Sequence, residues 1–181
     1  MHHKPKARTR LLLAAVAVTA SAGLALGAAA PLATASGPHV VDGTGSAYND
    51  WGDEGTLSVS SHSRSNATRL WQSVLYADGA KWKDANGGLH TFTASDIDGI
   101  FGPKTRSATK YWQAQEELEY IDGIAGQETF GQADGFLDGP YNNGDVLYSG
   151  VAHEVTFKRI DGKYHVRIGS KWKLAAYDWR G

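Results

Sequence analysis

Apolar residues recur at helical spacing in the stretch that follows Ser65. They stand three or four positions apart, which places them on one face of a helix: Ala67, Leu70, Trp71, Val74 and Leu75. Ser65 or Asn66 can cap the start of this helix by accepting a hydrogen bond from a free backbone N–H. Asp78-Gly79 can end it, because glycine suits the left-handed conformation that follows a helix.

Two more helices are predicted farther along the chain. In residues 97–113, Asp98-Gly99 predicts a tight turn. Gly102-Pro103 predicts a helix start, because proline suits the first helical position. This second helix runs over about residues 103–117. A shorter third helix is expected over about residues 127–133, after another glycine.

Two phrases of the sequence occur twice. I-D-G-I-x-G-x-x-T begins at Ile97 and again at Ile121, an offset of 24 residues. T-(K/R)-x-W-Q begins at Thr68 and again at Thr109, an offset of 41 residues. The interleaved repeats predict a compact, pseudo-symmetric unit built from turn–helix pieces.

The tail of the chain has the period of β-strands. Residues 153–160 alternate between apolar and polar, and Asp161-Gly162 is favoured in a two-residue hairpin turn. This turn pairs Ile160 with Lys163, which places the apolar side chains of the two strands on one face of the hairpin. A three-residue turn at 169–171 would then add Trp172 to that apolar face. The pattern predicts an antiparallel sheet of three or four strands, which must dock on the helices or on a partner because it is small.

These elements together predict an α+β fold, with a small three-helix bundle followed by the antiparallel β-sheet. We expect a helical domain over residues 63–134 and a β-rich C-terminal module over residues 135–181. Both fall within a chain of 181 residues, which is long enough for one domain or two small ones.

Two segments show neither the helical nor the strand period. Residues 36–62 are rich in Gly, Ser, Asn and Asp, which predicts a flexible linker. Its large aromatic residues, Tyr48 and Trp51, either fold back onto the domain or stay exposed. Residues 80–93 are predicted as a polar loop that contains Trp82 between two lysines.

The first thirty-five residues have the pattern of a secretory signal peptide. Lys4, Lys6, Arg8 and Arg10 precede the apolar run LLLAAVAV, and the A-x-A sequence at 33–35 offers a cleavage site. A transmembrane anchor is the competing interpretation, but polar and small residues soon break the apolar run. We therefore expect residues 1–35 to be removed, no membrane association afterwards, and a protein that is extracellular or associated with the cell wall.

Charge and cysteine content exclude several classes of function. Four of the 18 basic residues lie in the signal peptide, so the rest of the chain carries 14 Lys and Arg against 19 Asp and Glu. This acidic balance argues against a nucleic-acid partner, which usually requires a basic surface. The chain has no cysteine, so disulfides, thiolate–metal sites and a cysteine nucleophile are excluded.

Three blocks of sequence resemble the peptidoglycan-binding-domain-like family, the three-helix modules of many bacterial wall hydrolases. The blocks occur in the family's order: TRLWQSVL at 68–75, DGIFGPKTRSATKYWQ at 98–113 and DGIAGQET at 122–129. Trp71 and Trp112 stand where Leu and Phe are usual. The resemblance covers roughly residues 63–134, and the tail looks like a segment that follows such modules in secreted actinobacterial proteins.

The resemblance implies peptidoglycan as the partner, through its stem peptide, its glycan or both, and it implies no cofactor. Aromatic faces suit sugar rings, and fixed polar groups set the orientation of a ligand. Four candidates lie near the D-G-I-F-G turn, and a fifth is a possible exposed platform: Asp98, Phe101, Thr105, Tyr111 and Trp82. Each also has a structural interpretation, since turns use Asp and Thr, and cores use aromatic residues.

The sequence contains no catalytic motif. Its histidines do not form a zinc-binding spacing, there is no G-x-S-x-G, and no pair of carboxylates is placed for glycoside cleavage. We therefore expect a secreted, non-catalytic peptidoglycan-binding protein rather than an enzyme. The alternative is a secreted interaction or inhibitor protein, in which the β tail binds a protein partner and the helical unit anchors it to the wall.

Overall fold

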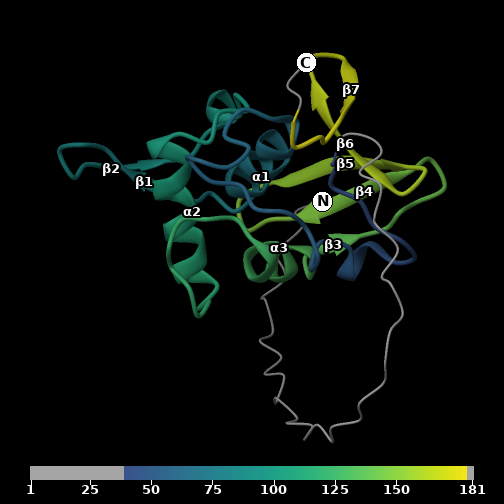
Figure 1. Cartoon of the computed structure of the whole chain (residues 1–181), viewed down its shortest axis with the longest axis horizontal. Helices are drawn as coiled ribbons and strands as arrows, with labels where there is room; N and C mark the ends of the chain where they lie inside the picture. Colours follow the sequence, from purple (N-terminus) through teal and green to yellow (C-terminus); the bar gives the residue numbers. More distant parts are fainter. Residues whose placement is uncertain (1–38, 179–181) are drawn as a thin grey trace, which may run out of the picture. The chain divides into compact units, whose positions relative to one another are not determined.

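The computed structural model describes residues 39–178, so the predicted signal peptide, residues 1–35, lies outside the described residues. Within them the fold is α+β, as predicted, with three α-helices and two antiparallel sheets. Figure 1 shows the helices beside a five-stranded sheet, with a two-stranded hairpin beyond them.

The three helices lie where the sequence predicts them. α1 spans Asn66–Ala77, α2 spans Pro103–Gln115 and α3 spans Gln127–Asp134. The hydroxyl of Ser65 caps α1 by accepting a hydrogen bond from the Thr68 N–H at 3.0 Å. No helix in residues 39–178 is long and apolar enough to span a membrane.

The tail forms five strands, so the prediction of three or four was too low. They are β3 (Leu137–Asp138), β4 (Asp145–Ser149), β5 (Glu154–Ile160), β6 (Lys163–Ile168) and β7 (Lys171–Leu174). The strands lie in chain order, and each neighbouring pair is antiparallel. β3 and β4 flank a turn-rich stretch, in which glycine, proline and asparagine obscure the strand pattern.

The predicted register of the first hairpin is confirmed, but the next turn differs. Ile160 pairs with Lys163 across β5 and β6, as expected. The turn after β6 has two residues rather than the three predicted at 169–171, so Arg167 pairs with Trp172. Because one residue of slip moves a strand's side chains to the opposite face, Trp172 lies on the polar face of the sheet.

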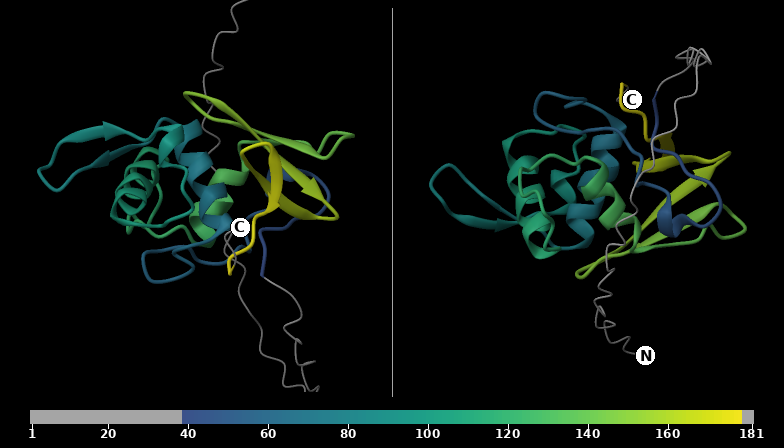
Figure 2. Two further views of the ribbon diagram at one scale, coloured as in Figure 1. Left: turned by 90° about the horizontal axis from the view of Figure 1, so that it is seen from above. Right: turned by 60° about the horizontal axis from the view of Figure 1, so that its bottom comes forward.

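Residues 80–93, predicted as a polar loop, instead contain a second sheet. β1 (Lys81–Lys83) pairs with β2 (Leu89–Thr91), and Trp82 stands opposite His90. Asp84 closes the turn between them by accepting two backbone hydrogen bonds. Figure 2 shows this hairpin projecting from the rest of the fold.

One buried cluster joins the helices to the five-stranded sheet. Asp78, at the end of α1, provides its central polar link. One carboxylate oxygen accepts hydrogen bonds from Trp112 Nε1 and the Tyr148 hydroxyl, both at 2.6 Å. The other accepts one from the Val151 N–H at 3.0 Å. Since these donors come from α2, β4 and the loop after β4, Asp78 fixes the helices against the sheet.

Residues 39–62, the part of the predicted linker that the structure describes, lie against this core. Trp51 is fully buried, whereas Tyr48 is 63% exposed. The Trp51 ring lies edge-on to three aromatic residues: Phe130, Phe157 and Tyr164. The division of the chain into a linker, a helical domain and a β-rich module stays a prediction.

Glu54 joins residues 39–65, the segment before α1 that we call the arm, to the end of the described chain. Its side chain is 4% exposed and accepts hydrogen bonds from the Asp42 N–H at 2.6 Å and the Tyr177 hydroxyl at 2.9 Å. Burial disfavours the charged carboxylate, and it raises the pKa of Glu54 from 4.5 to about 7 although both hydrogen bonds act to lower it.

The stability of the fold is therefore expected to depend on Glu54 between pH 4.5 and pH 7. In this range the folded protein keeps a proton that the unfolded chain releases, so the free energy of unfolding falls as the pH rises. The loss is up to about 3 kcal/mol. Glu54→Gln stays neutral, so it should unfold at higher urea than the wild type at pH 8.

Urea unfolding at pH 4.5, 6 and 8 measures this effect. Asp53→Asn is the matched control, because Asp53 is the exposed neighbouring carboxylate. Identical pH profiles for the wild type and Glu54→Gln would contradict the assignment.

Candidate functional site

One buried side chain of α1 holds the first D-G-I turn. Gln72 Nε2 donates to Asp98 Oδ1 at 2.9 Å, the Ile100 carbonyl at 3.1 Å and Thr105 Oγ1 at 3.1 Å. Gln72 Oε1 accepts a hydrogen bond from the Gly99 N–H at 2.7 Å. The amide thus binds the turn on both its donor and its acceptor side.

The second D-G-I turn is held in the same way by α2. Gln113 Nε2 donates to Asp122 Oδ1 at 3.3 Å, the Ile124 carbonyl at 2.8 Å and Thr129 Oγ1 at 3.0 Å. Gln113 Oε1 accepts from the Gly123 N–H at 2.9 Å. We call each arrangement a glutamine clasp.

The clasps give the sequence repeats a physical reason. Each combines the glutamine of one T-(K/R)-x-W-Q phrase with the following D-G-I turn. The turn glycines, Gly99 and Gly123, have φ values of +75° and +76°, which L side chains rarely adopt. The repeated residues therefore build the scaffold of the site.

Three of the predicted binding residues belong to this scaffold or the core. Asp98 is exposed, but its Oδ1 also accepts a hydrogen bond from the Ile100 N–H at 2.8 Å. Thr105 is 2% exposed and donates its hydroxyl to the Ile100 carbonyl at 3.2 Å. Phe101 is 1% exposed. Their ligand-binding roles stay predictions.

The other two predicted binding residues lie at the surface of α2 and of the hairpin. Tyr111 is half-buried and packs against the core. The Trp82 ring stacks on His90 with centroids 4.7 Å apart, and Lys104 Nζ lies 4.6 Å from its centroid. Side chains of this protein therefore already contact the ring that the sequence suggests as an exposed platform.

A pocket of about 640 Å³ opens beside the first clasp. Ile100, Phe101 and Pro103 line it from the turn and the start of α2. Val59 and Arg64 line it from the arm, and α2 adds Arg106 and Lys110. Of the five predicted residues, Phe101 is the one that lines this pocket.

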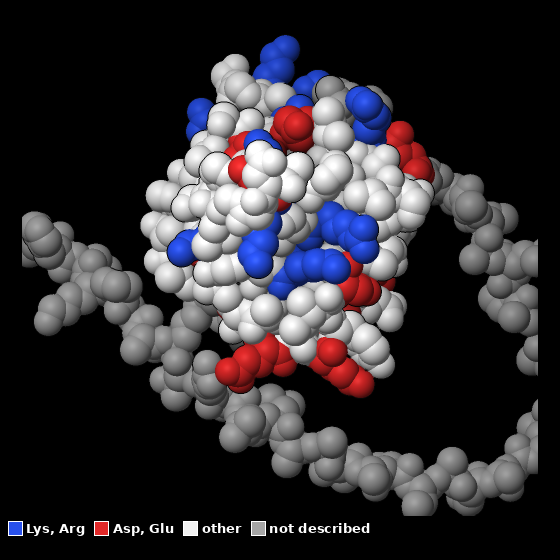
Figure 3. All heavy atoms as spheres, turned by 90° about the vertical axis from the view of Figure 1, so that its left-hand side faces the viewer, with Lys and Arg blue, Asp and Glu red and all other residues white. Residues whose placement is uncertain are grey.

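The pocket is basic. Arg64, Arg106 and Lys110 are exposed, and none of them forms a salt bridge with a residue in the range 39–178. Lys104, by contrast, pairs with Asp96 at 2.6 Å. Figure 3 views the side of the hairpin and α2, and it shows Lys and Arg side chains gathered at the centre of that face.

Sequence reasoning missed these three cations. Arg106 and Lys110 are four residues apart in a predicted helix, which places them on one face and could have indicated a basic stripe. Arg64 reaches the pocket because its backbone forms a bridge with Ile100 across 36 positions of the chain. No pattern in the sequence indicates that pairing.

Residues 81–132 match the family model described as a putative peptidoglycan binding domain. The matched segment begins at β1, includes α2 and the second glutamine clasp, and ends within α3. This part of the chain is therefore similar to putative peptidoglycan-binding domains, as the sequence resemblance implies. No curated protein and no solved structure matches the chain.

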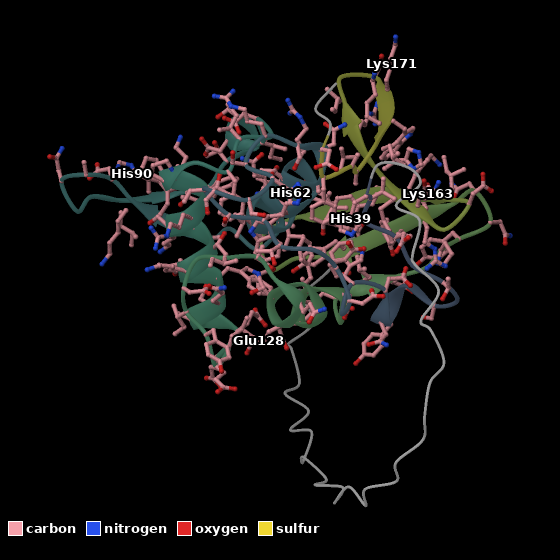
Figure 4. All side chains as sticks on the ribbon, viewed as in Figure 1. His39, His62, His90, Glu128, Lys163 and Lys171 are labelled. Carbon is pink, nitrogen blue, oxygen red and sulfur yellow. The ribbon has the colours of Figure 1, made fainter. Side chains whose placement is uncertain are left out.

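The titratable side chains do not gather into a metal site in the described part of the chain. His39 and His62 both contact the Tyr177 ring. The ring centroid of His39 lies 4.3 Å from that of Tyr177, and the ring centroid of His62 lies 5.2 Å from it. Figure 4 shows His90 well separated from both, on the hairpin.

Replacing Gln113 with Met should destabilise the fold. The thioether is of similar length but leaves the Gly123 N–H without its acceptor and removes the amide donor to the Ile124 carbonyl and Thr129 Oγ1, which costs roughly 2–4 kcal/mol. Urea unfolding measures the loss. Gln115→Met on the exposed face of α2 is the control, with a change below about 0.5 kcal/mol. Equal effects of the two substitutions would rule out the clasp as a major contribution.

Replacing Gly123 with Ala should cost more than replacing Gly45 with Ala. Both glycines have positive φ, at +76° and +71°, so both substitutions add backbone strain of about 1 kcal/mol. A Cβ at Gly123 would also lie 2.8 Å from the Arg106 carbonyl oxygen, whereas Gly45 has open space. We expect an extra loss of about 1–3 kcal/mol by thermal or urea unfolding. Equal losses would show that the close approach at Gly123 is unimportant.

Proposed function

We propose that this protein is a secreted, non-catalytic protein that binds peptidoglycan outside the cell or in the cell wall. The ligand is the stem peptide, the glycan or both. The observation that carries the proposal is that the family match at residues 81–132 includes the turn and helix that form one wall of the basic pocket.

Two further observations support a binding role. The family model that matches residues 81–132 is described as a putative peptidoglycan binding domain. The pocket combines an apolar wall with a few polar and charged side chains, the composition that ligand sites commonly have. Secretion is supported by the signal-peptide pattern of residues 1–35.

Sedimentation with purified, protein-free sacculi tests the proposal. We expect residues 36–181 to sediment with the sacculi, without loss of turbidity and without release of muropeptides. Chitin, a glycan without stem peptides, shows whether the sugar chain alone suffices.

A protein that stays in the supernatant would contradict wall binding. Released muropeptides would contradict the non-catalytic role. Sedimentation that requires an added wall protein would instead favour a protein-interaction role.

A further inference from the structure

The arm before α1 builds one wall of the basic pocket. Leu57 and Ala125 exchange two backbone hydrogen bonds, of 2.9 and 3.0 Å, beside the second D-G-I turn. Near the first turn, the Phe101 N–H donates to the Ser63 carbonyl at 2.8 Å, and the Ser65 N–H donates to the Gly99 carbonyl at 3.1 Å. The arm is therefore attached at both glutamine clasps, and it lies outside the family match.

The segment between these attachments is itself ordered by local hydrogen bonds. Ser58 Oγ accepts from the Ser60 and Ser61 N–H groups at 3.2 and 3.0 Å, and the Ser58 N–H donates to the Ser61 carbonyl at 2.9 Å. This turn presents Val59, which is 46% exposed, as an apolar edge of the pocket. An apolar edge and three cations thus face one space.

The three cations are arranged unfavourably unless an anion joins them. Arg106 and Lys110 are like charges at positions i and i+4 of one helix, which repel each other. α2 has no acidic residue in its first turn to offset the positive end of the helix dipole. No carboxylate in residues 39–178 pairs with Arg64, Arg106 or Lys110.

We propose that this pocket binds a peptide carboxylate, with Arg64, Arg106 and Lys110 as its partners. Guanidinium groups form paired hydrogen bonds with carboxylates, and an adjoining apolar edge suits the aliphatic part of a short peptide. The volume of about 640 Å³ is sufficient for a few residues. The source of the carboxylate, the stem peptide of peptidoglycan, rests on the proposed function. Arg64 makes the arm part of the site.

Calorimetric titration of residues 36–181 with a soluble muropeptide tests the proposal. We expect Arg64→Gln, Arg106→Gln and Lys110→Gln each to weaken binding about tenfold, since each removes a charge-assisted hydrogen bond. Lys171→Gln is the matched control, because it removes the same charge from the exposed start of β7 (Figure 4) and should change binding less than about twofold. Circular dichroism and melting temperature verify that each variant is folded.

Amidation of the muropeptide carboxylates identifies the group that is bound. Amidation should weaken wild-type binding about tenfold and have less effect on Arg106→Gln, because the two changes remove the same interaction. Arginine and lysine also bind phosphate, so phosphate is the other anion to test. Two measurements test it: competition by inorganic phosphate, and binding to sacculi from which phosphate polymers have been stripped. Competition by phosphate, with binding lost from stripped sacculi, would overturn the carboxylate assignment.

The outcomes separate this inference from the proposed function. Wild-type binding that is unchanged in the three pocket variants would overturn the pocket assignment and leave peptidoglycan binding intact. A wild-type protein that binds neither muropeptide nor sacculi would overturn both.

Discussion

The buried amides of Gln72 and Gln113 are the interaction on which the rest of the helical unit depends. Each amide accepts a hydrogen bond from the glycine N–H of a tight turn, which would otherwise be unpaired in the interior, and gives the turn's carbonyl a further donor. An unpaired buried group costs about 1–3 kcal/mol, so each clasp strongly favours one turn geometry. Because the glutamines come from successive helices, the clasps also fix α1 and α2 relative to the turns that follow them.

The pocket is a consequence of that geometry. The first clasp sets the path of the turn that forms its floor, and the second holds Gly123 under the aliphatic parts of Arg106 and Lys110. Asp78 then joins this unit to the five-stranded sheet through Trp112 and Tyr148. The wall-binding role that we propose therefore belongs to the helical unit, and the five-stranded sheet packs against that unit.

The sequence was sufficient for elements whose signals are local. Helical periodicity located the first helix, glycine and proline start signals located the other two, and Asp161-Gly162 set the register of β5 and β6. The β1–β2 hairpin has no apolar alternation, and a two-residue turn placed Trp172 on the other face. The basic pocket was not predicted, because Arg64 is brought to it by a backbone bridge with Ile100. That contact between distant parts of the chain forms only in the folded protein.

Amide chemical shifts during titration with a soluble muropeptide test the central claim most directly, because they report where on the fold the ligand binds. In 15N-labelled protein, we expect the largest changes in the segments 59–64 and 100–110, which contain the residues that line the pocket. Amides of β4, β5 and β6 should change little. Changes confined to the five-stranded sheet, with none around the pocket, would contradict the account.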